Sequence, residues 1–140
     1  MDSLNESYQK TTYTVSSLSI RIAQLNPILD QFLQCNQKTE WIYITAWNPF
    51  SDASLSMQQS NQRNTERNQA LLKTLQKRKD WIILPGWGIA DACDWPPEAS
   101  FLVLGAGEEE GRALAKEFKQ KAFLYGCNGD TARLLEQGAL

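Results

Sequence analysis

The chain has 140 residues, of which 42% are hydrophobic and 21% are charged, with a formal net charge of −2 and no histidine. The length predicts one domain, and the composition is that of an ordinary globular protein. The net charge gives no indication of the basic surface that binds nucleic acid or anionic lipid. The absence of histidine excludes Ser-His-Asp and Cys-His catalysis and removes the commonest ligand of catalytic zinc.

The N-terminal residues also bear on location. They are acidic and polar where a signal peptide needs a positive start and an apolar run, and no stretch approaches the ~20 apolar residues of a membrane span. The three cysteines, Cys35, Cys93 and Cys127, are far apart and form no CxxC pair, so we expect reduced thiols. These features predict a cytoplasmic protein without a membrane partner, and they disfavour nucleic-acid binding.

The first third of the chain predicts three elements after a flexible polar tail at residues 1–10. Residues 13–22 alternate in part and predict a strand, or a strand pair broken near Ser16-Ser17. Asn26-Pro27 predicts the cap of a helix. Its apolar face, at helical spacing, comprises Leu25, Ile28, Leu29, Phe32 and Leu33. Residues 41–47 (WIYITAW) predict a strand covered on both faces.

The remaining residues predict alternating helices and strands. In chain order they are a long helix at about 57–78, a strand at 81–84, an irregular loop at 85–99, a strand at 100–104, a helix at about 108–119, a strand at 122–125 and a short final helix at 130–136 capped by Asp130. The order β-α-β-α-β-β-α-β-α predicts an α/β or α+β fold. We therefore expect a single domain over residues 11–140, with helices packed on a mixed sheet.

The helix at 57–78 carries polar residues on its core line. Leu71 and Leu75 set the stripe, and extending it backwards by helical spacing reaches Asn68 and Asn64, with Arg67 one turn before Leu71. A buried amide or guanidinium without a partner costs on the order of 1–3 kcal/mol, so each needs backbone or a ligand. The alternative is a solvated helix end, because residues 58–69 lack large apolar side chains.

Polar groups also follow the strand at 41–47. Thr45 and Asn48 lie where this strand ends, and Pro49 holds Asn48 extended, so its amide can reach across a cleft. The alternative for Asn48 is an Asx-type turn that closes the strand.

Glu98 follows two prolines and precedes the strand at 100–104. A carboxylate beside Trp95 can have a raised pKa and act as a general acid or base. Two alternatives are ligand binding and anchoring of the loop, for example by pairing with Arg67. The glycines around 105–107 resemble a dinucleotide loop, but Glu108 to Glu110 occupy the helix N-terminus where a pyrophosphate would bind. No metal site and no cofactor are predicted.

Five ordered blocks carry a family resemblance. They are ITAWNPFS (44–51), NTERNQALLKTL (64–75), PGWG (85–88), WPPEASFLVLG (95–105) and EFKQKAF (117–123). From about Tyr13 to Leu135 the chain resembles the uncharacterised bacterial domain of unknown function 3293 family. The resemblance implies functional positions at Thr45, Asn48, Asn64, Arg67, Glu98 and Gln120. Lys121 departs from the Asn that often follows this Gln in the family.

These observations leave three functional hypotheses. The first is a binding domain for a small polar metabolite or nucleotide, with one polar cleft lined by Thr45, Asn48, Asn64, Arg67, Asn68 and Gln120, and with Trp47, Trp87 and Trp95 as apolar walls. The second is a hydrolase or transferase in which Glu98 is the acid or base and Arg67 holds an anionic group. The third is an accessory protein that binds a protein partner through the Trp-rich loop 85–99.

Overall fold

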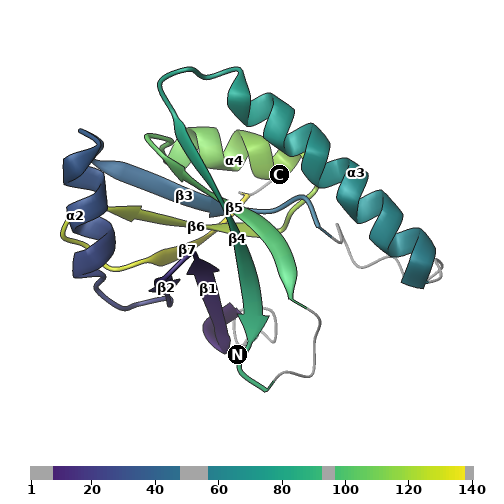
Figure 1. The fold of residues 1–140 in the computed structure, drawn as a ribbon, viewed down its shortest axis with the longest axis horizontal. Coiled ribbons are helices and arrows are strands. Elements are labelled where there is room, and N and C mark those ends of the chain that lie inside the picture. Colours follow the sequence, from purple (N-terminus) through teal and green to yellow (C-terminus); the bar gives the residue numbers. More distant parts are fainter. Residues whose placement is uncertain (1–7, 48–56, 93–96, 138–140) are drawn as a thin grey trace.

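One curled sheet organises the chain. The computed structural model describes residues 8–47, 57–92 and 97–137. The strands are β1 (Thr11–Val15), β2 (Leu18–Ile20), β3 (Glu40–Ile44), β4 (Ile82–Ala90), β5 (Glu98–Leu104), β6 (Ala122–Cys127) and β7 (Arg133–Glu136), and the helices are α2 (Pro27–Cys35), α3 (Met57–Gln76) and α4 (Glu108–Glu117). The sheet order is β2-β1-β4-β5-β3-β6-β7 (Figure 1).

The sheet is antiparallel between its described neighbouring strands. Its two edges meet through a parallel bridge between Ile22 and Ala132, where the Ala23 amide donates to the Ala132 carbonyl at 2.8 Å. The result is a single α+β domain, which confirms the predicted fold class, but the expected mixed sheet is wrong because each described strand pair is antiparallel. Among the described residues, no helix is both long and apolar enough to cross a membrane.

The sheet separates two hydrophobic cores. We call them the inner core, which α2 covers, and the outer core, which α3 and α4 cover (Figure 1). The inner core comprises Tyr13, Val15, Leu18, Ile20, Leu29, Leu33, Trp41, Tyr43, Leu102, Leu104, Leu124 and Ala132. The outer core comprises Ile42, Ile44, Ala46, Leu71, Leu75, Trp81, Val103, Ala106, Leu114, Ala115, Phe123 and Tyr125. Alternate residues of β3 and β5 therefore serve opposite cores, as expected for a strand buried on both faces.

The helix α2 begins where its sequence predicts. The Asn26 side chain accepts a hydrogen bond from the Leu29 amide at 3.1 Å, and Pro27 follows as the first helical residue. Leu29 and Leu33 are buried, but Leu25 and Ile28 are 62% and 68% exposed. The predicted apolar face is therefore too wide. Only the part of it that contains Leu29 and Leu33 packs against the curled sheet, and Leu25 and Ile28 remain in solvent.

The predicted loop at 85–99 is wrong over most of its described length, because β4 continues to Ala90 and β5 starts at Glu98. Position 86 requires glycine because neighbouring atoms fill the space that a side chain would take. A Cβ on Gly86 would lie 2.3 Å from the Thr14 carbonyl oxygen and 2.8 Å from the Tyr43 hydroxyl. The Tyr43 ring meets the Tyr13 ring edge-on at 5.2 Å. Residues 93–96 lie outside the described part of the chain.

The predicted final helix at 130–136 is also wrong, since residues 133–136 form the strand β7. This strand pairs with β6, with Ala122 opposite Glu136 and Tyr125 opposite Arg133. The Asp130 carboxylate accepts from the Thr131 amide at 2.8 Å, a contact within the turn. Long-range pairing with β6 therefore overrides the local helical preference. In the predicted tail, Tyr8 packs against the inner core, and residues 1–7 lie outside the described ranges.

A polar cluster at the end of β3

Asn68 bridges two strands where their pairing ends. Ile44 faces Phe101 in the β3–β5 register, so Ala46 would face Ala99 two residues further on. Instead, the Asn68 Oδ1 accepts from the Ala46 amide at 2.8 Å, and its Nδ2 donates to the Ala99 carbonyl at 2.8 Å. Asn68 is 7% exposed. Its amide replaces the missing contact between the strands and thereby fixes α3 to the end of β3.

Thr45 closes the same strand end from its own side. Its hydroxyl donates to the Ala99 carbonyl at 2.6 Å and accepts from the Trp47 amide at 2.9 Å. The hydroxyl therefore both donates to and accepts from backbone groups. Ala99 accepts from two side chains at once, which matches the two lone pairs of a carbonyl oxygen.

Gln120 reaches this strand end from α4. The chain leaves α4 through a Schellman turn, in which the Gln120 amide donates to the Ala115 carbonyl at 2.8 Å and Lys119 adopts a φ of 57°. The Gln120 Nε2 then lies 3.3 Å from the Trp47 carbonyl and 3.4 Å from the Phe118 carbonyl. Ala46 and Trp47 are therefore held by the amides of Asn68 and Gln120, respectively.

Arg67 lies on α3 directly before Asn68 and is partly buried. Arg78, just beyond the end of α3, forms an ion pair with Glu110 in the first turn of α4 at 3.5 Å. This pair joins the chain beyond the C-terminal end of α3 to the N-terminal end of α4.

Asn64 continues the buried line of α3 one turn before Asn68. It is 4% exposed, although its neighbours along this turn are solvent-exposed, and it is already engaged by another group of the chain. The predicted inward line of amides is therefore present at both positions. Asn48 lies outside the described residues.

Glu98 is assigned to the opposite face of the sheet. It alternates with Ser100, Leu102 and Leu104 along β5, and the two leucines belong to the inner core. Its charge acts on the tyrosines there: burial, and secondarily Glu98, raises the pKa of Tyr8 to about 12. The structure therefore brings Thr45, Asn68 and Gln120 together at the end of β3, with Asn64 and Arg67 on the same helix as Asn68, and it separates Glu98 from them.

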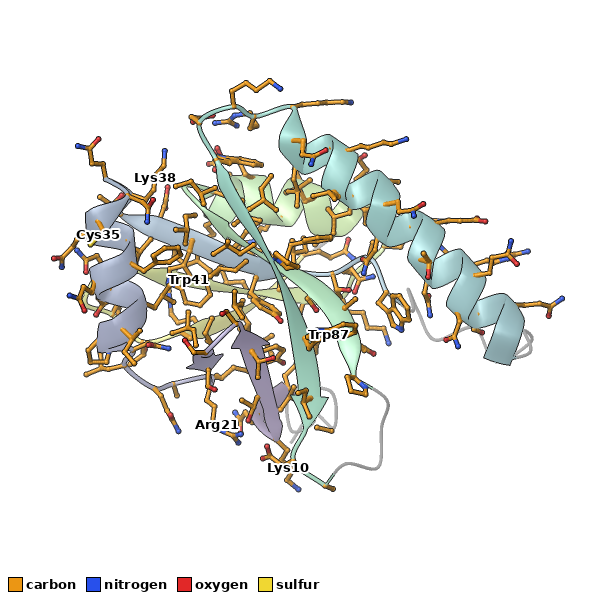
Figure 2. The ribbon with its side chains drawn as sticks, viewed as in Figure 1. Lys10, Arg21, Cys35, Lys38, Trp41 and Trp87 are labelled. Atoms are coloured by element: carbon orange, nitrogen blue, oxygen red, sulfur yellow. The ribbon has the colours of Figure 1, made fainter. Side chains whose placement is uncertain are left out.

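The predicted aromatic walls are also divided. Trp47 is part of the polar cluster through its backbone and is partly buried. Trp87 lies on β4 and is 51% exposed, whereas Trp41 lies beside α2 (Figure 2). Trp95 lies outside the described ranges.

Two polar groups of the cluster have unused hydrogen-bonding capacity. Among the described residues, the partly buried Arg67 makes no hydrogen bond and no ion pair. Within the same part of the chain, the Gln120 Oε1 accepts no hydrogen bond, because both contacts of this amide are made by Nε2. By contrast, the hydroxyl of Thr45 and both amide atoms of Asn68 are engaged. Arg67 and Gln120 are therefore the groups best able to meet a ligand.

Several members of the cluster have no signal in the sequence. The carbonyls of Trp47 and Ala99 are backbone groups, so no residue type marks them. Lys119 lacks the glycine that usually reveals a Schellman turn. A separate cluster near the start of α4 was also missed, in which the Tyr125 hydroxyl lies 2.9 Å from Glu40 Oε1 and 3.0 Å from Cys127 Sγ.

The model of the family described as Protein of unknown function (DUF3293) matches residues 44–123, more than half of the chain. The chain therefore belongs to this family. The matched range contains the described members of the cluster, from Thr45 to Gln120. No curated protein and no solved structure matches the chain.

Proposed function

We propose that this member of the DUF3293 family binds a small polar metabolite with an anionic group at the polar cluster between α3 and α4. The observation that carries the proposal is Arg67, a partly buried guanidinium with no acidic partner among the described residues. A guanidinium offers five donors in a planar fork, the geometry that carboxylates and phosphates match. Taking this charge partly out of water is costly unless an anion approaches it.

Two features of the surroundings support an anionic ligand. Lys116, Lys119 and Lys121 lie at the end of α4 and flank Gln120, and they outnumber the one acidic residue of this segment, Glu117, in a chain whose net charge is −2. In addition, the backbone at residues 45–47 is fixed by Thr45, Asn68 and Gln120. A rigid wall beside a cation lowers the ordering cost of binding.

A cytoplasmic location is part of the same proposal. The free thiols of Cys35 and Cys127 fit a reducing compartment. Soluble metabolites such as nucleotides, sugar phosphates, amino acids and dicarboxylates are abundant there, and they form the ligand panel that tests the proposal.

The test is thermal unfolding of the full chain against that panel, with wild type beside Arg67→Gln and Arg63→Gln. Arg63 is a matched control because it is an exposed arginine one turn earlier on α3. A ligand present at a hundred times its Kd stabilises the folded state by about 2.7 kcal/mol, a shift of several degrees. We expect at least one anionic compound to shift wild type and Arg63→Gln but not Arg67→Gln. The proposal fails if no compound shifts wild type, or if Arg67→Gln responds equally.

A further inference from the structure

We infer that one basic side of α3 binds the phosphate backbone of a nucleic-acid duplex. The inference starts from an uneven distribution of charge along the chain. Residues 57–80 contain six of the 14 basic residues but only two of the 16 acidic ones. The net charge of −2, which disfavours nucleic acid as a partner, therefore averages a basic segment with an acidic remainder.

Four of these basic residues lie on one side of α3 and of the turn that follows it. At the helical periodicity, Arg63, Arg67 and Lys73 lie within about 120° of the helix circumference. Lys77 directly follows the last helical residue, and its amide still donates to the Thr74 carbonyl at 3.2 Å, so the turn continues through it. We call Arg63, Arg67, Lys73 and Lys77 the basic flank.

The basic flank is not neutralised by the described part of the protein. Three of its members are exposed and Arg67 is partly buried, and none of the four side chains forms an ion pair or a hydrogen bond with a described residue. Glu66, the one acidic residue of α3, accepts from the Gln62 Nε2 at 3.5 Å. Arg63 and Arg67 are one turn apart, where like charges repel each other. A bound anion removes this repulsion.

The chemistry of the exposed surface of α3 distinguishes among anionic partners. Apart from the basic flank, the exposed residues that the structure describes on this helix are amides, Thr65, Glu66 and Ala70. A membrane surface binds an apolar helix face, and protein interfaces are anchored by aromatic or large apolar side chains. The exposed surface described here offers neither. Phosphate contacts need only cations and hydrogen-bond donors, so a nucleic-acid backbone fits this surface.

The shape of α3 favours a duplex over a single strand. Its sequence contains no aromatic residue on which unpaired bases could stack. Arg63 and Lys73 lie about 15 Å apart along the helix axis. One strand of a duplex places a phosphate about every 3.4 Å along its axis, so this length spans about four phosphates. Figure 1 shows α3 at the periphery of the molecule, where a rigid duplex can approach it.

Salt-dependent binding tests the inference. The full chain is titrated into a short fluorescein-labelled DNA duplex, and into an RNA duplex of the same sequence, and fluorescence anisotropy is measured at several salt concentrations. We expect a Kd of about 10⁻⁴–10⁻⁶ M at physiological salt, as for sequence-independent binding. The logarithm of the association constant should fall with the logarithm of the salt concentration with a slope of about −3 to −4, because each of four contacts contributes about 0.9. Tighter binding to one duplex identifies the source of the phosphates.

The test variant is the double substitution Arg63→Gln/Lys73→Gln, which removes two charges and keeps good helix formers. It should weaken binding and reduce the magnitude of the salt slope by about 2. Lys10→Glu is the matched control, because it changes the net charge by the same amount at an exposed residue away from α3 (Figure 2). We expect this control to keep the slope of wild type. Circular dichroism of each variant confirms that it is folded.

Four results would overturn the inference: wild type binds neither duplex at low salt, the double variant keeps the slope of wild type, Lys10→Glu loses as much of it, or labelled poly-L-glutamate or a single strand binds as tightly as the duplex. The proposed function is tested separately, because it depends on Arg67, which the double variant retains. A metabolite that stabilises wild type should therefore also stabilise the double variant, even though that variant binds the duplex weakly.

Discussion

Replacing Asn68 should destabilise the fold far more than its place on a polar helix suggests. In Asn68→Ala, the Ala46 amide loses its acceptor at 2.8 Å, in a position where Ala46 is fully buried. An orphaned buried donor costs about 1–3 kcal/mol. The Ala99 carbonyl loses its bond from Asn68 but keeps the one from the Thr45 hydroxyl, so this second lost bond adds little to the cost. We therefore expect the free energy of unfolding to fall by about 2 kcal/mol.

Asn68→Asp tests the direction of the amide. Its carboxylate can accept from Ala46 but repels the Ala99 carbonyl, whereas the protonated acid can make both contacts. Burial and this repulsion should raise the pKa of the new acid in the folded state above its unfolded value of about 3.9. The folded state then binds the proton more tightly, so stability is greatest below about pH 4 and falls as the pH rises through the folded pKa.

Urea unfolding, followed by circular dichroism at pH 4 and pH 7, measures both effects. Asn61→Ala is the matched control, since Asn61 is an exposed asparagine on the same helix and should change stability by less than about 0.5 kcal/mol. The bridging role of Asn68 is refuted if Asn68→Ala is no more destabilised than Asn61→Ala, or if Asn68→Asp matches wild type at pH 7.

Three further predictions concern other positions. Gly86→Ala should lower the free energy of unfolding in urea by more than about 2 kcal/mol, because its Cβ would lie 2.3 Å from a backbone oxygen. Gly88→Ala is the control and should be tolerated, since its Cβ would have its nearest atoms at 3.6 Å; equal effects would contradict the steric argument. Lys119→Gly should raise stability by about 0.5–1 kcal/mol, because it removes the strain of a left-handed non-glycine residue, and a lower denaturation midpoint would count against this reading. In a Cys93→Ser background, a disulfide reagent should label the exposed Cys35 faster than Cys127, because Cys127 is partly buried and its sulfur lies against the Tyr125 hydroxyl; the reverse order would disprove it.

Several features could be predicted from the sequence because they depend on local physics. The cap at Asn26-Pro27 marks the start of α2, and the continuous apolar run before Thr45 marks a strand buried on both faces. The inward line of α3 could be extended from Leu71 back to Asn64 by helical spacing alone. These predictions needed only residues within two or three turns of one another.

Long-range contacts decided the rest. Residues 130–136 favour a helix locally, but residues 133–136 pair with β6 instead. The glycines of β4 predict a loop from the sequence alone, whereas in the fold they make room for the side chains of Tyr13 and Tyr43. The exposure of Ile28 depends on how far the curled sheet extends beneath α2.

The candidate site shows the same division. Its residue types were visible in the sequence, but their roles depend on partners far away in the chain. Asn68 is a bridge because Ala46 and Ala99 lie on either side of it, 22 and 31 residues away. Glu98 is set apart because strand alternation directs it to the inner face. The sequence by itself indicated that Asn64 and Asn68 lie on the inward line of α3, because that follows from helical periodicity. Only the tertiary structure decided which polar groups have partners within the described residues, because Asn68 meets Ala46 and Ala99 from distant parts of the chain whereas Arg67 meets no polar partner there.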